Sequence, residues 1–145
     1  MRARTATRLA WWLCAVALVM MAARLVVVVL GAATPLPPGF PPPVVQAIEV
    51  IGFLGAPILG GVIAAHRPQN LYGWLWCAIG LSLGVTFLAV GYGAYTLVVE
   101  PGALPGGVAA AWVSSVTTYL VLGLLPFVFL LFPDGRLPSR RWRPV

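Results

Sequence analysis

Four long apolar segments make up most of the chain, separated by short stretches rich in proline, glycine and charged residues. The segments cover approximately residues 9–30, 44–65, 71–98 and 108–132. A helix that crosses a bilayer needs about 20 such residues. Strands of a membrane β-barrel would alternate apolar and polar positions over about 10 residues each. The pattern therefore predicts an all-α polytopic membrane protein, a four-transmembrane-helix bundle in a single membrane domain.

The first apolar segment has a second possible interpretation, a cleavable signal peptide. A basic start and the small residues of Gly31-Ala32-Ala33 fit such a peptide. However, the apolar region of a signal peptide is about 7–15 residues long. This segment is longer and contains Arg24, so we expect an uncleaved membrane anchor.

The connecting segments and two internal prolines carry local structural signals. Pro68 disfavours helix at Arg67, and Asn70 is a good N-cap for the third segment. Pro57 and Pro126 lie inside the second and fourth segments, where each removes a backbone donor. We therefore expect kinks in these two helices.

Charge distribution predicts the orientation of the helices. All nine basic residues are arginine, and the formal net charge is +6. Eight of them lie in the two tails or in the 66–70 turn, which an even number of spans brings to one side. Arginine-rich segments stay cytoplasmic and face anionic headgroups. The sequence thus predicts that both termini lie inside (N-in/C-in). It also predicts that the arginines contact the lipid bilayer and not nucleic acid.

Small residues recur at helical spacing in the two middle segments. The second segment has Gly52, Ala56 and Gly60 at every fourth position, and the third has Gly80 and Gly84 as a GxxxG pair. Lipid does not drive helices together, so contacts in membranes depend on close backbone approach. We interpret both sets as helix-packing faces. A permeation path lined by glycine is the alternative.

Arg24 and Glu49 are the two charges inside predicted spans. Ionisable groups at such positions are costly and raise a functional hypothesis. The proline-rich loop of residues 34–43 joins the first two segments. Counted from the segment ends beside this loop, Arg24 lies about 9 Å and Glu49 about 8 Å deep, at about 1.5 Å per residue. We predict an intramembrane ion pair between them. The alternatives are side chains that extend separately to the headgroups, or a ligand or proton site.

Other candidate chemistry is sparse. The single histidine, His66, lies at the end of a span, and Cys14 and Cys77 lack the spacing of metal ligands. Residues 114–119 form a hydroxyl-rich patch, which predicts bonds within or between helices or, alternatively, a pocket wall. The sequence has no phosphate-binding loop or nucleophile elbow. We therefore predict no enzyme activity, cofactor or metal site.

Two motifs carry a resemblance to a known family. The turn reads HRPQNLYGW from His66, and the end of the fourth segment reads LLFPDGRLPSRRW from Leu130. In this order and spacing they resemble the N-terminal membrane region of sensor histidine kinases from actinobacteria and related bacteria. Leu71 stands where that family usually has proline. The resemblance implies a multi-pass protein of the bacterial cytoplasmic membrane in a two-component signal transduction system.

The kinase activity of that family is not expected here. Its phospho-acceptor helix and ATP-binding domain have no counterpart in the 145 residues, so the resemblance implies a sensor or anchor module. The partners it implies are a second copy of the chain or kinase domains missing from it. The chain is then either a fragment of a longer kinase or a module that functions alone.

The segment 133–145 is rich in arginine. Its arginines are expected to contact anionic headgroups, which contributes about 1 kcal/mol each; they are Arg136, Arg140, Arg141 and Arg143.

The alternative function is a small four-helix proton- or cation-coupled transporter that works as a dimer. In that case Glu49 would carry the proton or cation.

Overall fold

The computed structural model describes residues 3–30, 39–102 and 104–132. Within these ranges five α-helices and one π-helix follow one another: α1 (Ala3–Leu30), α2 (Pro43–Phe53), α3 (Gly55–His66), α4 (Leu71–Ala94), η1 (Tyr95–Val99) and α5 (Gly107–Leu131). Four helical stretches are long and apolar enough to cross a membrane: Arg4–Val29, Pro43–His66, Leu71–Val99 and Gly107–Leu131. The predicted all-α class with four such helices is confirmed. The candidate headgroup-binding residues Arg136, Arg140, Arg141 and Arg143 lie outside the described residues.

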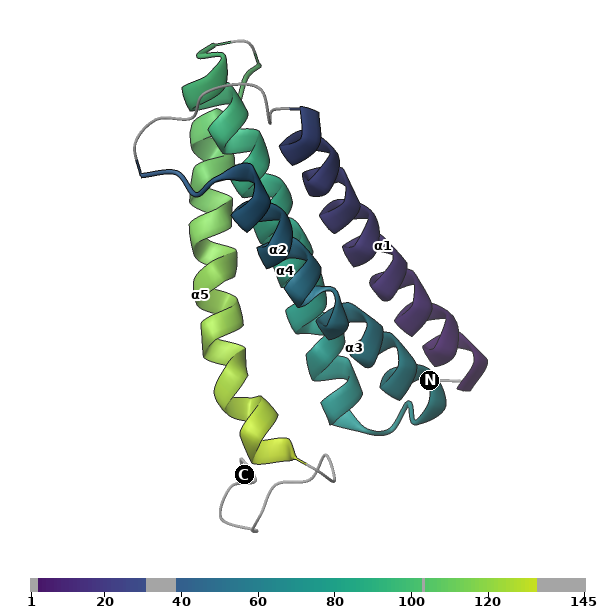
Figure 1. Ribbon diagram of the computed structural model, residues 1–145. Helices are drawn as coiled ribbons and strands as arrows, with labels where there is room; N and C mark the ends of the chain where they lie inside the picture. Colours follow the sequence, from purple (N-terminus) through teal and green to yellow (C-terminus); the bar gives the residue numbers. More distant parts are fainter. Residues whose placement is uncertain (1–2, 31–38, 103, 133–145) are drawn as a thin grey trace.

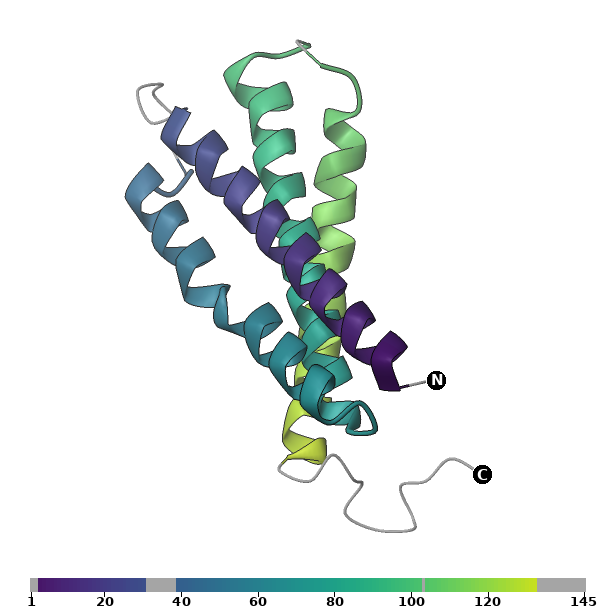
Figure 2. The same cartoon turned by 90° about the vertical axis from the view of Figure 1, so that its right-hand side faces the viewer.

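Helix α4 occupies the centre of the arrangement. It packs against α1, α3 and α5, whereas α5 packs mainly against α4 alone (Figure 1). The start of α1, the turn between α3 and α4 and the end of α5 lie at one end of the bundle (Figures 1 and 2). Arg4, Arg8 and Arg67 therefore belong to the same end, because an even number of long apolar helical segments separates them.

The second apolar segment is two helices rather than one kinked helix. Helix α2 ends at Phe53 and α3 begins at Gly55, with Leu54 as a turn between them (Figure 1). Pro57 has no amide hydrogen to donate to the Phe53 carbonyl, and its ring crowds that carbonyl. The expected kink is therefore a break located three residues before the proline. Pro126 does not break its helix, because α5 continues through it.

Local signals set the two ends of α4. The Asn70 side chain accepts a hydrogen bond from the Tyr72 amide at 2.9 Å, which confirms Asn70 as the N-cap. At the other end the helix widens into η1, where the Glu100 amide donates to the Tyr95 carbonyl at 2.9 Å. This π-helical turn was not expected from the sequence.

Glycines bring α3 and α4 into backbone contact. A Cβ atom at position 80 would lie 2.6 Å from the Cα of Pro57, and one at position 60 would overlap the backbone of Cys77. Ala56 lies in the same contact and is buried. These approaches leave no room for larger side chains, so the two helices interlock along residues 56–64 and 73–80.

The predicted packing face of the second segment does not extend to Gly52. This residue is exposed, and a Cβ atom there would have nothing within 4 Å. The break at Leu54 separates α2 from α3, so residues spaced by four across it no longer share one face. Gly84 belongs to another contact, because a Cβ atom there would lie 3.1 Å from the Ala17 carbonyl oxygen of α1.

Helices α1 and α4 run parallel and meet at positions seven residues apart. Ala10 packs with Cys77, and Ala17 lies against Gly84. One heptad further along both helices, Arg24 lies against Gly91. A repeat of seven residues keeps side chains of parallel helices on the same seam. The third layer of this seam therefore holds an arginine where the first two hold alanine.

Candidate functional site

Arg24 is buried between α1, α2 and α4, with 7% of its surface exposed. Gly91 makes this possible, because a Cβ atom there would lie 2.8 Å from Nη1 of Arg24 and 2.9 Å from its Cδ. The side chain thus fills the space that a larger residue on α4 would take. The result is a cationic group inside an otherwise apolar helix contact.

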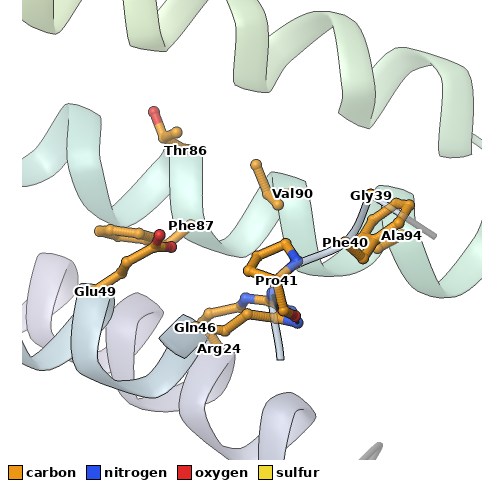
Figure 3. A pocket seen from close by; sticks show the side chains of 10 residues that line it. All are labelled: Arg24, Gly39, Phe40, Pro41, Gln46, Glu49, Thr86, Phe87, Val90 and Ala94. Carbon is orange, nitrogen blue, oxygen red and sulfur yellow. Dashed lines mark hydrogen bonds between the residues drawn. The ribbon is translucent and has the colours of Figure 1, made fainter. Parts of the chain in front are cut away.

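The hydrogen-bond partner of Arg24 is an amide. Its Nη2 donates to Oε1 of Gln46, and Nε2 of Gln46 donates in turn to the Pro41 carbonyl at 2.7 Å (Figure 3). Gln46 is itself only 8% exposed. Both polar ends of the amide are therefore used, and the Arg24 side chain is tied to the first turn of α2.

The predicted partner, Glu49, has a different position. In the part of the chain that the structure describes, no ion pair joins Arg24 to Glu49, and Glu49 is exposed. Figure 3 shows its carboxylate set apart from the Arg24 guanidinium. The two charges do lie around the same pocket. Gln46 precedes Glu49 by three residues on the same helix face, and it reaches Arg24 first.

Gln46 is a residue of the site that was not predicted from the sequence. A formal charge is not required in the partner of Arg24, because an amide at the same depth can accept a guanidinium hydrogen bond equally well. The sequence does contain a signal for Gln46, because it is the one strongly polar side chain besides Glu49 between Val44 and Phe53. Charge alone was therefore an insufficient guide to the partner.

Two adjoining pockets open around Arg24, Phe40, Gln46 and Ala94. The smaller has a volume of about 300 Å³ and adds Glu49, Thr86 and Phe87 to its walls (Figure 3). The larger has a volume of about 540 Å³ and extends towards η1 and the loop that follows it. Ligand pockets range from about 300 to 1,000 Å³, so both are of a useful size.

The hydroxyl-rich patch of α5 lines neither pocket. Ser114 and Ser115 donate to the Ala111 carbonyl one turn earlier. Thr117 donates to the Val113 carbonyl in the same way, and it also connects the helices because it accepts a hydrogen bond from the Thr86 hydroxyl of α4 at 2.7 Å. The expected bonds within and between helices thus account for these hydroxyls.

The remaining candidates show no clustered chemistry. Nδ1 of His66 lies 2.8 Å from the Val62 carbonyl oxygen, and Cys14 and Cys77 are buried free thiols. No group of three or more histidine, cysteine or acidic side chains is placed to hold a metal ion within residues 3–30, 39–102 and 104–132. The polar chemistry of these ranges is therefore concentrated at the Arg24 pockets.

Fold and site together define a class: an all-helical protein with four helices able to span a membrane and a cationic pocket between three helical elements. No protein-family model, curated protein or solved structure matches the chain. The function must therefore be inferred from the residues of the site.

Neutralising Glu49 is expected to have little effect on stability. Exposed charge pairs contribute about 0–1 kcal/mol, and the hydrogen bond of Arg24 goes to Gln46. Glu49→Gln should therefore lower the free energy of unfolding in detergent by less than about 1 kcal/mol. A larger loss that disappears when Arg24 is also replaced by glutamine would show that the predicted ion pair forms after all.

Proposed function

We propose that this protein is an integral sensor or anchor module of a bacterial cytoplasmic membrane, with four spans and both termini inside. The observation that carries the proposal is the buried cation of Arg24 in a pocket, at the opposite end of the bundle from Arg4, Arg8 and Arg67. The arginine-rich end is cytoplasmic by the positive-inside rule. The pocket then faces the outside, where it can respond to an external compound.

The four apolar helices support membrane insertion. A charged side chain in such a helix is expensive, and residues of this kind usually mark functional positions. The resemblance of the 66–74 turn and the 130–142 segment to sensor histidine kinases supports a signalling role. In this proposal the module passes its state to kinase domains, either in a partner chain or fused to it.

Membrane orientation can be tested by labelling introduced cysteines in intact cells. Leu104 and Gln69 are both exposed, in the loop after η1 and in the α3–α4 turn. Leu104→Cys should react with a membrane-impermeant maleimide from outside, and Gln69→Cys should react only after the membrane is permeabilised. The unaltered chain is the control, because Cys14 and Cys77 are buried. The reverse pattern, or equal labelling of both sites, would contradict the orientation.

The sensor role can be tested by fusing the full chain to the cytoplasmic core of a sensor histidine kinase. Coupling between distant sites commonly changes an equilibrium about 5–150-fold. Arg24→Gln should therefore change the autophosphorylation rate of the fusion about fivefold or more. Val26→Phe, on the exposed side of the same helix, is the control and should leave the rate unchanged. Equal rates for all three fusions would argue for an anchor without a sensory role.

A second candidate function rests on the position of Glu49. Its carboxylate borders the smaller pocket and has no hydrogen-bond partner among the described residues. A carboxylate of this kind can carry a proton or cation in a small dimeric transporter. Uptake of a cationic dye into proteoliposomes distinguishes the two candidates. Uptake that Glu49→Gln abolishes would support the transporter over the sensor.

A further inference from the structure

The larger pocket has apolar walls and one buried cation. Val27 and Val28 lie one turn beyond Arg24 on α1, and Leu88 and Tyr92 face them from α4. Glu100 lies at the far end, where its Oε2 accepts a hydrogen bond from the Tyr95 hydroxyl at 2.8 Å. A ligand of this pocket therefore contacts hydrocarbon along most of its length.

Arg24 has hydrogen-bonding capacity that the protein does not use. A guanidinium has five N–H donors, and within the described residues the only hydrogen bond of Arg24 goes to Gln46. None of its side-chain nitrogens is both fully enclosed and unpartnered. The unused donors are therefore accessible on a side chain that lines both pockets. Gln46 supplies no charge, and Glu49 of the adjoining pocket acts on the cation only through space, with no ion pair between the two in the described part of the chain.

The charges of the pocket restrict the ligand further. Guanidinium groups bind carboxylates and phosphates through two parallel hydrogen bonds. One arginine balances one negative charge, and a second would be repelled by Glu49 in the adjoining pocket and by Glu100 at the other end. A group with a single negative charge suits this arrangement better than a doubly charged phosphate.

We propose that the larger pocket binds a monocarboxylate with an apolar body, its carboxylate on Arg24 and its body along Val27, Val28 and Leu88. This inference deepens the proposed sensor function by naming the chemical class of the compound sensed. Two sources share this chemistry: a small water-soluble carboxylate from outside the cell and a long-chain fatty acid from the bilayer.

Calorimetric titration of the full chain in phosphatidylcholine nanodiscs tests the proposal, with empty nanodiscs as the blank. The probes are 3-phenylpropanoate for the aqueous source and palmitate for the bilayer source, each compared with its neutral primary amide. A hydrogen-bonded charge pair should make the carboxylate bind about tenfold or more tightly than the amide. Binding of either acid supports the proposal and identifies the source. Equal affinity of acid and amide for both probes overturns it.

Two variants separate the charge from the shape of the pocket. Arg24→Gln should remove the preference for the acid, and Val27→Phe should weaken acid and amide alike by filling the pocket. Val26→Phe is the matched control, since Val26 is 55% exposed on the same helix and does not line the pocket. Each variant must first unfold in detergent as cooperatively as the unaltered chain. If Val26→Phe weakens binding as much as Val27→Phe, the larger pocket is not the binding site.

The outcome of this experiment is independent of the orientation of the chain. A protein that binds no carboxylate can still label at Leu104→Cys from outside, in which case the ligand class is wrong and the membrane module stands. A protein that binds the carboxylate but labels in the opposite pattern keeps the pocket and loses the proposed orientation.

Discussion

Replacing Gly80 with alanine is expected to destabilise the protein although alanine favours helix. A Cβ atom at position 80 would lie 2.6 Å from the Cα and 2.7 Å from the nitrogen of Pro57, and backbone atoms do not yield easily. Overpacking of this kind costs about 1–3 kcal/mol and occasionally more. Gly80→Ala should therefore lower the free energy of unfolding by at least about 1 kcal/mol, measured by denaturant titration in detergent micelles.

The control for Gly80 comes from two glycines of other helices. Gly52 and Gly123 have nothing within 4 Å of a Cβ atom. Alanine is favoured over glycine in helices by about 1 kcal/mol, so Gly52→Ala and Gly123→Ala should leave the protein as stable as before or more so. If Gly80→Ala behaved like these two variants, α3 and α4 would not interlock as described. Helix propensity favours alanine at all three positions, so it cannot explain a lower free energy of unfolding for Gly80→Ala alone.

Replacing Gln46 with leucine is expected to have the second large effect. Gln46 accepts the hydrogen bond of the buried Arg24 guanidinium and donates to the Pro41 carbonyl. Hydrogen bonds to charged groups contribute about 1.5–3 kcal/mol, and a buried cation without a partner is unfavourable. Gln46→Leu should therefore lower the free energy of unfolding by about 1.5–3 kcal/mol in the same titration.

Removal of both partners should reverse most of this loss. Replacing a buried polar pair by apolar side chains of similar size is often neutral or stabilising. The double variant Arg24→Met with Gln46→Leu should therefore unfold at a higher denaturant concentration than Gln46→Leu alone. Gln69→Leu, the same substitution at an exposed turn position, is the control and should change stability little. A double variant less stable than Gln46→Leu would show that Arg24 stabilises the fold by itself.

These predictions separate the stability of the bundle from the role of its pocket. Ala10 and Ala17 show that α1 and α4 can meet through small residues alone. An arginine in the third layer is not needed for that contact, and burying its charge is costly. A double apolar variant that is stable but fails to bind a carboxylate would assign Arg24 to ligand recognition and not to folding.

Some features of the fold follow from the sequence alone. Long apolar runs are predicted to be helices because an isolated helix satisfies its own backbone hydrogen bonds. Asn70 is recognisable as an N-cap because capping involves groups only two residues apart. The common side of Arg4, Arg8 and Arg67 follows from the even number of apolar segments between them. Each of these signals is local or additive, so no knowledge of packing is required.

Other features were decided only by the tertiary structure. The glycine spacing suggested one face through Gly52 and Gly60, but the break at Leu54 removed Gly52 from it. Similar depths of Arg24 and Glu49 predicted an ion pair, yet the hydrogen bond of Arg24 goes to Gln46. Which polar side chain reaches a guanidinium depends on helix rotation and on the room that Gly91 leaves. The four long helical segments and their order thus follow from the sequence, whereas the break at Leu54 and the composition of the pocket follow from the tertiary structure. Side-chain contacts depend on ångström-scale placement, which residue spacing does not encode.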